Sequence, residues 1–211
     1  MFAVYGAGGF GREVLPLVRA MAGDEDVVFV DDAAGEHGPR ELNNQPVVTL
    51  DQLSDDCRGV TIAVGDPFIR EQMAARCLQR GLPSMQVRAH DVTIYDRVEI
   101  GEGAILCART LITSNVRIGR HFHCNIFSYV AHDCVIGDFV TFAPRVNCNG
   151  AIVVEDFAYI GTGAILRQGR ADQPLRIGRG ATVGMGAVVT RDVPPGVTVA
   201  GNPARPLEKS A

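Results

Sequence analysis

The residues best suited to chemistry in this sequence are a histidine and an aspartate that follow one another, His132 and Asp133. A histidine takes up and releases a proton near neutral pH, which suits it to act as a general base. Adjacent side chains on a regular strand point to opposite faces, so these two can meet only where the chain turns. The same two residues also fit a solvent-facing surface turn with no chemical role. The elements around the pair decide between these interpretations.

The pair lies within a six-residue repeat that fills most of the chain. The lead residues of this repeat are Ile94, Ile100, Leu106, Ile112, Ile118, Cys124, Val130, Ile136, Phe142, Cys148, Val154, Ile160 and Leu166, and the phase resumes at Ile177 after an insertion. At 46% hydrophobic content, such an unbroken apolar run is rare by chance, and no helix or hairpin has this period. A parallel β-helix does, because its short strands stack coil on coil. We expect the glycines that follow lead residues, such as Gly101, Gly119 and Gly137, to form its sharp corners.

The first third of the chain has the pattern of a small nucleotide-binding α/β domain. A buried strand at 2–5 leads into the G-x-G-x-x-G turn at 6–11, a helix from 12 to 22, a strand at 27–30 and two aspartates. Further strands are expected at 46–48 and 60–64, with a helix from 68 to 80, which gives three or four strands. Glycines let the backbone approach a phosphate, and a helix N-terminus favours negative charge. We favour a nucleotide-containing ligand; an NAD-dependent enzyme, or a tight turn that binds nothing, is the alternative.

The amino-acid composition argues against several classes of protein. A net charge of −4 argues against a general nucleic-acid-binding protein, which needs a basic surface. No apolar stretch of about 18 residues predicts a membrane span, and no basic leader precedes an apolar run at the N-terminus. The six cysteines form no C-x-x-C pair, which argues against a zinc ribbon and favours reduced thiols in the cytoplasm.

Three further features of the sequence allow competing interpretations. His121 and His123 beside Cys124 suggest a metal site, but Cys124 is a lead residue that faces the core, so no metal is expected. Cys134 as an acyl-enzyme nucleophile is an alternative that we do not favour. Basic residues outnumber acidic ones seven to three between positions 167 and 209, a face that fits either a phosphorylated small molecule or plain solvent.

Six motifs together make the chain resemble a known family. They are Val4–Gly11, Phe29–Asp32, Ala63–Asp66, Ala131–Asp138, Ile160–Gly163 and Ala200–Arg205, spread over nearly the whole chain. In this combination the sequence is similar to the bacterial hexapeptide-repeat acetyltransferases of the sialic acid O-acetyltransferase and nucleotide-aminosugar N-acetyltransferase type. The resemblance implies an α/β, Rossmann-like domain over residues 1–88 that holds a nucleotide-sugar rather than NAD. It also implies an all-β left-handed parallel β-helix over residues 89–211, a homotrimer, and direct transfer of acetyl from acetyl-CoA.

The resemblance also implies roles for particular residues. His132 would be the general base, and Asp133 the acidic neighbour that raises its basicity. The residues implied to contact acetyl-CoA are Thr141, Thr162 and Met185, and Asn125 would line the acceptor pocket. The residues implied to hold the nucleotide-sugar are Gly8, Gly9, Phe10, Asp31, Asp32 and Gly65. Many relatives have histidine in place of Phe10, so only the backbone role of the glycines carries over at that turn.

The repeat places these residues on the edges of a prism. Thr162 lies five hexads after His132 and so falls on a different edge, whereas Met185 returns to the edge of Thr162. One chain cannot easily bring two outer edges together, but a trimer can. We therefore predict an active site at the subunit interface, with His132 from one chain and the acetyl-CoA edge from the next. The insertion at 167–176 falls on the edge of His132, where it either covers the site or is a neutral surface loop.

The predicted function is acetyl-CoA-dependent N-acetylation of a nucleotide-linked amino sugar, an NDP-4-amino-4,6-dideoxyhexose, in cytoplasmic glycan or polysaccharide biosynthesis. UDP, GDP and dTDP are equally compatible with the sequence. The alternatives are O-acetylation of a sugar such as sialic acid, an NAD-dependent enzyme, and a non-catalytic β-helix that binds or scaffolds other molecules.

Overall fold

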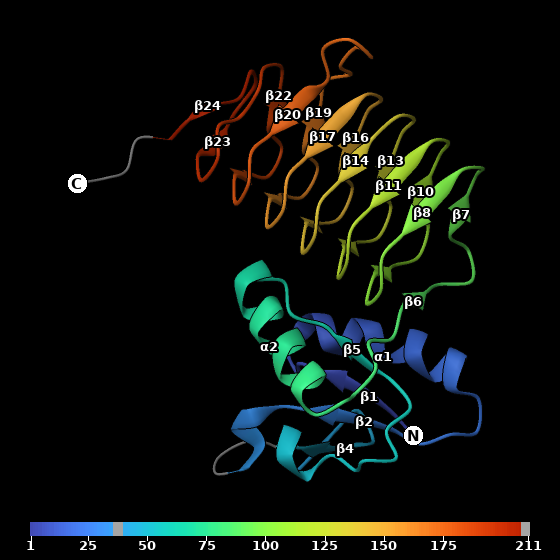
Figure 1. Cartoon of the computed structure of the whole chain (residues 1–211). Helices are drawn as coiled ribbons and strands as arrows, with labels where there is room; N and C mark the ends of the chain where they lie inside the picture. The colour runs from blue at the N-terminus through green and yellow to red at the C-terminus, as the bar shows by residue number, and fades with distance from the viewer. Residues whose placement is uncertain (36–39, 208–211) are drawn as a thin grey trace. The chain divides into compact units, whose positions relative to one another are not determined.

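The computed structural model describes residues 1–35 and 40–207 (Figure 1). The chain divides into two compact units, Met1–Val87 and Arg88–Ala211. The first unit combines α-helices with a sheet, and the second consists of short strands wound into a left-handed parallel β-helix. The fold class predicted from the sequence is therefore confirmed.

The first unit is built on a five-stranded sheet in the order β3-β4-β2-β1-β5. Its strands are β1 (Phe2–Tyr5), β2 (Val27–Val30), β3 (Glu41–Leu42), β4 (Gln45–Val48) and β5 (Val60–Ile62). β1 is central and pairs in parallel with β2 and β5. The expectation of three or four strands was wrong because it lacked β3, which pairs antiparallel with β4. Asn43 and Asn44 join the two with φ angles of 50° and 60°, a conformation that asparagine tolerates in tight hairpin turns.

In residues 1–35 and 40–87, two α-helices and two short 3₁₀ helices accompany the sheet. They are α1 (Gly9–Ala22), α2 (Pro67–Gln79), η1 (Asp32–Gly35) and η2 (Leu50–Gln52). α1 begins at Gly9, before the predicted start at 12, and takes in the end of the glycine-rich turn. Gly11 is required there because a Cβ would lie 1.8 Å from the carbonyl oxygen of Gly6. α2 begins with proline, which is favoured at that position, and the Asp66 side chain accepts hydrogen bonds from its first turn.

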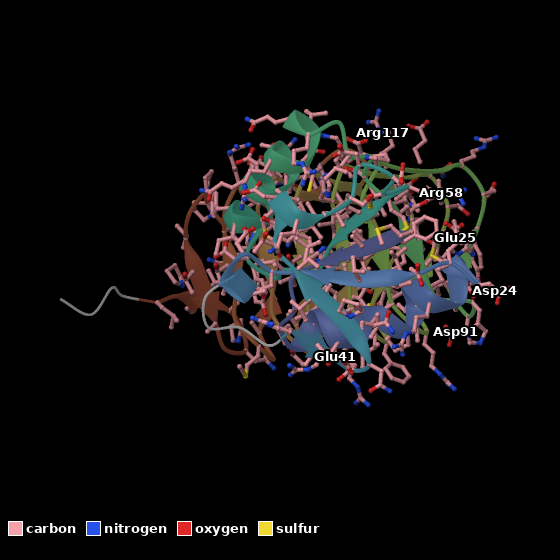
Figure 2. All side chains as sticks on the ribbon, turned by 90° about the horizontal axis from the view of Figure 1, so that it is seen from below. Asp24, Glu25, Glu41, Arg58, Asp91 and Arg117 are labelled. Carbon is pink, nitrogen blue, oxygen red and sulfur yellow. The ribbon has the colours of Figure 1, made fainter. Side chains whose placement is uncertain are left out.

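Charged groups lie at the amino-terminal ends of β1, β2 and β5 in the first unit. Glu25 precedes β2 and Arg58 precedes β5, and the two form an ion pair (Figure 2). Glu25 also accepts a hydrogen bond of 3.3 Å from the amino group of Met1. These groups are partly exposed to solvent, so they add little to stability.

The carboxyl-terminal edge of the sheet is the edge where open α/β sheets bind their ligands.

Over residues 87–207 the strands form three sheets, one for each face of the β-helix. The first comprises β7 (Thr93–Ile94), β10 (Leu111–Ile112), β13 (Tyr129–Val130), β16 (Asn147–Cys148), β19 (Ile165–Leu166) and β22 (Val188–Val189). The second comprises β8 (Val98–Ile100), β11 (Val116–Ile118), β14 (Val135–Ile136), β17 (Ile152–Val154) and β20 (Leu175–Ile177). The third comprises β6 (Val87–Arg88), β9 (Ile105–Leu106), β12 (His123–Cys124), β15 (Thr141–Phe142), β18 (Tyr159–Ile160), β21 (Thr182–Val183), β23 (Thr198–Ala200) and β24 (Arg205–Pro206).

Stacking in register explains the period of the repeat. Val130 pairs with Ile112 in the coil below and with Cys148 in the coil above, so one coil contains 18 residues. The lead residues from Leu106 to Val189 are at most 5% exposed. Burial of one large apolar side chain is worth about 1.5–3 kcal/mol, so this column of side chains is a major source of stability. The repeat fixes both the core and the height of each residue along the β-helix.

The glycines that follow lead residues have a different role from the one predicted. Positive φ angles occur two residues later, for example 68° at Gly103 and 57° at Phe139. A Cβ at Gly137 would lie 2.6 Å from the backbone nitrogen of Asp156 in the next coil. The prediction that Gly101, Gly119 and Gly137 form the corners was therefore wrong. They are glycines because adjacent coils approach closely at these positions.

Candidate active site

His132 and Asp133 lie at the corner between β13 and β14, and their side chains are in contact. Nδ1 of the His132 ring is 2.7 Å from Oδ2 of Asp133. The two side chains can meet because Asp133 has a φ of 59°, which interrupts the alternation of a strand. Aspartate adopts this left-handed conformation more readily than most residues. The corner therefore permits a pairing that a regular strand would prevent.

The coil below holds Asp133 in place. Its Oδ1 accepts a hydrogen bond of 3.1 Å from Nδ2 of Asn115, and its backbone N–H donates to the carbonyl of Ser114 at 3.2 Å. Hydrogen bonds with His132 and then with Asn115 lower the pKa of the Asp133 carboxyl. Because the carboxylate is ionised, it accepts the hydrogen bond and Nδ1 of His132 carries the proton. In the neutral ring this tautomer leaves the lone pair on Nε2, which a general base requires.

Gly150 leaves the space that the His132 ring occupies. It lies one coil above His132, and a Cβ at this position would be 2.5 Å from both Cε1 and Nε2 of the ring. The backbone of Gly150 is not in the left-handed region, so the ring is what excludes a side chain here. Both His132 and Asp133 have 51% of their side-chain surface exposed. The ring is therefore fixed on one side and open to solvent on the other.

The predicted acetyl-CoA residues Thr162 and Met185 lie on a different edge of the β-helix. Both follow strands of the third sheet, and the N–H of Gly186 donates to the carbonyl of Thr162 at 2.8 Å. Met185 is 81% exposed, which is unusual for so apolar a side chain. Asn125 lies on this same edge, two coils below. The structure groups these three predicted residues with one another and separates them from His132.

The remaining acetyl-CoA prediction, Thr141, falls on β15 in the third sheet. Its side chain is only 4% exposed, unlike the open turns at Thr162 and Met185. A contact with acetyl-CoA at Thr141 stays a prediction.

The insertion at 167–176 continues the edge of His132, as the hexad count predicts. The N–H of Gly169 donates to the carbonyl of Gly150 at 2.9 Å, which places the start of the insertion two coils above His132. Arg170 and Gln173 then exchange backbone hydrogen bonds of 3.0 Å in a tight hairpin. The hairpin and the residues beside it surround a small hollow of about 100 Å³.

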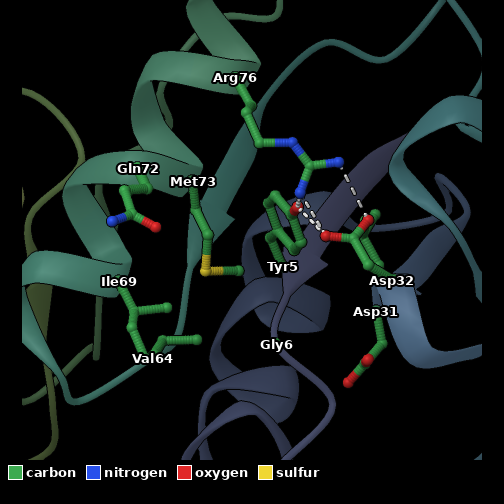
Figure 3. Close-up of a pocket in the computed structure, with 10 residues that line it drawn as sticks. Tyr5, Gly6, Asp31, Asp32, Val64, Ile69, Gln72, Met73 and Arg76 are labelled. Carbon is green, nitrogen blue, oxygen red and sulfur yellow. Dashed lines mark hydrogen bonds and ion pairs between the residues drawn. The ribbon is translucent and has the colours of Figure 1, made fainter.

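The first unit contains a cavity of about 320 Å³ at the carboxyl-terminal ends of β1, β2 and β5 (Figure 3). Its sheet side is formed by Tyr5, Gly6, Val30, Asp31, Asp32 and Val64. Its helix side is formed by Ile69, Gln72, Met73 and Arg76 of α2. Two of the residues predicted to hold a nucleotide-sugar, Asp31 and Asp32, therefore lie in the cavity wall.

The other predicted nucleotide-sugar residues lie at the N-termini of the two helices. Gly8 caps α1, Gly9 and Phe10 form its first turn, and Gly65 comes just before α2. Buried Arg70 fixes the loop before α2, because its Nη1 donates to the carbonyl of Gly65 at 3.2 Å. Helix N-termini of this kind favour phosphate groups.

A polar network lies at one end of the cavity (Figure 3). The hydroxyl of Tyr5 donates to Oδ2 of Asp32 at 2.6 Å and accepts from Nη1 of Arg76 at 2.7 Å. Arg76 and Asp32 also form an ion pair. Partial burial alone would raise the pKa of Asp32, but hydrogen bonds from Arg76 and Tyr5 outweigh it and lower that pKa. Burial, and then the hydrogen bond to Asp32, raises the pKa of Tyr5, so the phenol stays protonated.

The helix side of the cavity was not predicted from the sequence. Ile69, Gln72, Met73 and Arg76 have the spacing i, i+3, i+4 and i+7, so they lie on one face of α2. This spacing is visible in the sequence, but a mixed stripe of apolar and polar residues is also typical of an ordinary amphipathic helix. Tyr5 was likewise expected only to end a buried strand.

Other groups of reactive type are buried in the β-helix. His121 stacks on Phe139 with ring centroids 5.0 Å apart, and His123 and Cys124 are fully covered. Cys134 is also buried, with its thiol 3.2 Å from a backbone carbonyl. Within residues 1–35 and 40–207, no three His, Cys, Asp or Glu side chains are grouped so that they could hold a metal ion. Over the same ranges, every helix is too short or too polar to cross a bilayer.

Comparison with known proteins relates this geometry to a family. Residues 2–77 match the family model of the PglD N-terminal domain. The whole chain is 41% identical to GDP-perosamine N-acetyltransferase of Escherichia coli O157:H7, of which it covers 97%. Among solved structures, WeeI from Acinetobacter baumannii AYE is 51% identical with a TM-score of 0.93, over 98% of this chain and 99% of WeeI.

Two further solved structures contain ligands. The acetyltransferase domain of PglB from Neisseria gonorrhoeae FA1090, in complex with acetyl coenzyme A, is 33% identical with a TM-score of 0.87 over 98% of both chains. A histidine-to-asparagine variant of perosamine N-acetyltransferase from Caulobacter crescentus, in complex with CoA and GDP-perosamine, is 26% identical with a TM-score of 0.89. That match covers 99% of this chain and 97% of the other. The chain belongs to the family of hexapeptide-repeat, acetyl-CoA-dependent N-acetyltransferases of nucleotide-linked amino sugars.

Proposed function

We propose that this enzyme transfers acetyl from acetyl-CoA to the amino group of a nucleotide-linked 4-amino-4,6-dideoxyhexose, with GDP-perosamine as the first substrate to test. Similarity over the full chain to GDP-perosamine N-acetyltransferase supports this choice, as does the Caulobacter relative in complex with CoA and GDP-perosamine. The observation in this chain that carries the proposal is the contact of 2.7 Å between His132 and Asp133. It leaves Nε2 of His132 available as a base.

The reaction requires an unprotonated amine beside the thioester. The lone pair of the amine nitrogen forms a bond to the acetyl carbonyl carbon, and the carbon–sulfur bond breaks. Nε2 of His132 takes the proton that the nitrogen loses and returns it to the departing sulfur, which gives an amide and free CoA thiol. Asp133 accepts the hydrogen bond from Nδ1 and stabilises the protonated ring during the step. No covalent bond to the protein forms, so Cys134 is not needed.

We place the complete site between two subunits of a homotrimer. His132 lies on one edge of the β-helix, whereas Asn125 and Thr162 lie on another. In a trimer whose axis is parallel to the β-helix, each residue keeps its height in every subunit. Asn125 is less than half an 18-residue coil below His132, roughly 2 Å at the usual spacing between strands. The neighbour's Asn125 would then stand level with His132, with its Thr162 between one and two coils above.

We also place the enzyme in the cytoplasm, in the biosynthesis of a glycan or polysaccharide. All six cysteines are buried free thiols, which suits a reducing compartment. A nucleotide-linked sugar is the activated form in which such polymers receive their units.

A substrate screen tests the reaction. The enzyme is incubated with acetyl-CoA and GDP-, UDP- or dTDP-linked 4-amino sugars, and thiol release and product mass are measured. We expect thiol release together with a product heavier by one acetyl group. Nucleotide sugars without the amine serve as controls. Failure with every amino sugar would contradict the proposal, and acetylation of a hydroxyl group on sialic acid instead would indicate an O-acetyltransferase.

Mixing of subunits tests the shared site. Trimers of His132→Ala and of Thr162→Trp, whose bulky side chain blocks the acetyl-CoA edge, are each expected to be inactive. After co-expression in equal amounts, a working site needs an intact His132 from one subunit and an intact edge from the next. Random assembly of a closed trimer provides both at about one site in four, so about a quarter of wild-type turnover should return. A mixture as inactive as its parents would overturn the interface arrangement.

A further inference from the structure

One face of α2 presents side chains to the cavity that the acetyl transfer leaves unexplained. Ile69, Gln72, Met73 and Arg76 line it from two successive turns of the helix (Figure 3). Ile69 is 50% exposed although it is apolar. Exposed apolar side chains that line a cavity commonly contact a ligand.

The chemistry of this face fits a nucleobase. Ile69, Met73 and Val64, which lies beside Ile69 (Figure 3), are apolar and can pack against the flat face of a base. The amide of Gln72 offers one hydrogen-bond acceptor and two donors, and the guanidinium of Arg76 offers donors. The edge of a nucleobase carries donors and acceptors in a pattern that differs from base to base. A planar, apolar ligand with a polar edge therefore matches what α2 offers.

Fixed contacts hold Arg76 in position for such a role. Its Nη1 donates to the hydroxyl of Tyr5 at 2.7 Å, and its Nη2 lies 3.3 Å from Oδ1 of Asp32. These bonds use only part of the donor capacity of a guanidinium, which has five N–H groups. A side chain that is already ordered loses less entropy when it binds.

The two ends of the cavity are lined by different chemical groups, and this difference would orient a bound nucleotide. Gly6 opens the glycine-rich turn that leads into α1, and Ile69 lies in the first turn of α2. Both helix N-termini favour phosphate groups. Arg76 lies two turns further along α2, beside Tyr5 and Asp32 (Figure 3). The diphosphate would therefore lie at the helix N-termini, and the base between Ile69 and Arg76.

We infer that Gln72 and Arg76 read the edge of the nucleobase while Ile69 and Met73 pack on its face, so that α2 decides which nucleotide the enzyme accepts. The inference rests on the proposed function, because it assumes that the nucleotide-sugar enters this cavity. It goes beyond the family assignment, which leaves the identity of the base open.

Binding of nucleoside diphosphates tests the inference without any acetyl transfer. GDP, UDP and dTDP are titrated by calorimetry into the wild-type trimer, Gln72→Ala, Arg76→Met and Gln79→Ala. Gln79 is the matched control, because it is an exposed glutamine of α2 outside the cavity. We expect Gln72→Ala to weaken the preferred diphosphate by about three- to tenfold, the loss of one or two hydrogen bonds. Gln79→Ala should bind as the wild type does.

Kinetics with the nucleotide-sugar separate base recognition from catalysis. Gln72→Ala should raise KM for the nucleotide-sugar by a similar factor and leave kcat and KM for acetyl-CoA unchanged. Suppose that diphosphate binding depends on Gln72 but the enzyme acetylates no amino sugar. This result would support the inference and refute the proposed function. Active variants at Gln72 and Arg76 that keep the wild-type order of preference among GDP, UDP and dTDP would overturn the inference alone. Thermal unfolding shows that each variant is folded.

Discussion

The two units of the chain differ in how far each one encloses its candidate site. In residues 1–87, the cavity has two walls, the edge of the sheet and one face of α2. In the β-helix, His132 and Asp133 stand on an outer corner with half of each side chain exposed. The first unit thus forms a pocket within one chain, whereas the second presents the His132–Asp133 pair on an open surface.

Architecture accounts for this difference. An open parallel sheet leaves a crevice at the carboxyl ends of its strands, and a neighbouring helix closes it. A β-helix directs each side chain either into its core or outward, so a pair on an outer corner, such as His132 and Asp133, stays exposed. Recognition of the nucleotide and transfer of the acetyl group should therefore be separable by mutation.

The largest expected effect comes from His132→Ala, which should disable the β-helix site and leave the cavity intact. Without its base the enzyme should lose about 10²- to 10⁴-fold in kcat. Binding of GDP should be unchanged, because the substitution lies in the other unit. Steady-state kinetics and calorimetry measure the two quantities. Near-normal turnover would remove His132 from the chemistry, and a matching loss of GDP binding would show that the two functions are not separable.

Gly150→Ala tests the β-helix site more finely than His132→Ala does, because it displaces the His132 ring without removing it. The new Cβ would lie 2.5 Å from the His132 ring, so the ring must shift or rotate. A displacement of about 1 Å can cost on the order of a hundredfold in rate, and we expect kcat to fall by about that much. The double variant with His132→Ala should be no slower than His132→Ala alone. Additive losses would mean that Gly150 acts independently of the ring.

Asp133→Asn should have a smaller effect, because His132 stays in place and only its partner changes. An amide stabilises a protonated ring less well than a carboxylate, so we expect kcat to fall by about tenfold. Asn115→Ala is the matched control: it removes the other hydrogen bond to the carboxylate and should cost less. The two variants are compared by kinetics at several pH values. Equal losses would indicate that the carboxylate only shapes the corner.

The smallest effect concerns the first unit and its stability to acid. The pKa of Asp32 is lowered in the folded protein, because hydrogen bonds from Arg76 and Tyr5 outweigh its partial burial. A carboxyl whose pKa is lower in the folded than in the unfolded protein stabilises the fold when the pH is above the ordinary pKa of aspartate. This stabilisation is lost as the pH falls through the lower pKa of the folded state. The melting temperature of the wild type should exceed that of Asp32→Asn by about 2 °C or less at pH 7, since the ion pair is exposed. The difference should shrink as the pH falls below the ordinary pKa of aspartate, about 3.9, and disappear once the pH is below the lowered pKa of the folded state; a constant difference would contradict this account.

The sequence predicts the β-helix better than it predicts the cavity, for a physical reason. The lead residues obey one rule, burial at every sixth position, so the spacing of Val130 and Ile136 is enough to locate His132 on its edge. The contact with Asp133 depends on a single dihedral angle of 59°, which composition does not determine. The wall of α2 was missed because Gln72 and Arg76 have the polarity of solvent-facing residues, and only the neighbouring sheet makes them part of a cavity. The role of Gly137 was mistaken for a similar reason, because its neighbour Asp156 belongs to another coil.

The 18-residue coil also makes the β-helix a molecular ruler. His132 and Thr162 are separated by a fixed number of rungs, and each rung adds or removes about 4.8 Å. Deleting one whole coil between them would remove three lead residues but keep the others in phase, so the fold should survive, yet His132 and Thr162 would lie one coil closer together. If the proposed site is shared between subunits, adding or removing coils above or below these two residues leaves their separation unchanged, whereas a change between them would disrupt the site.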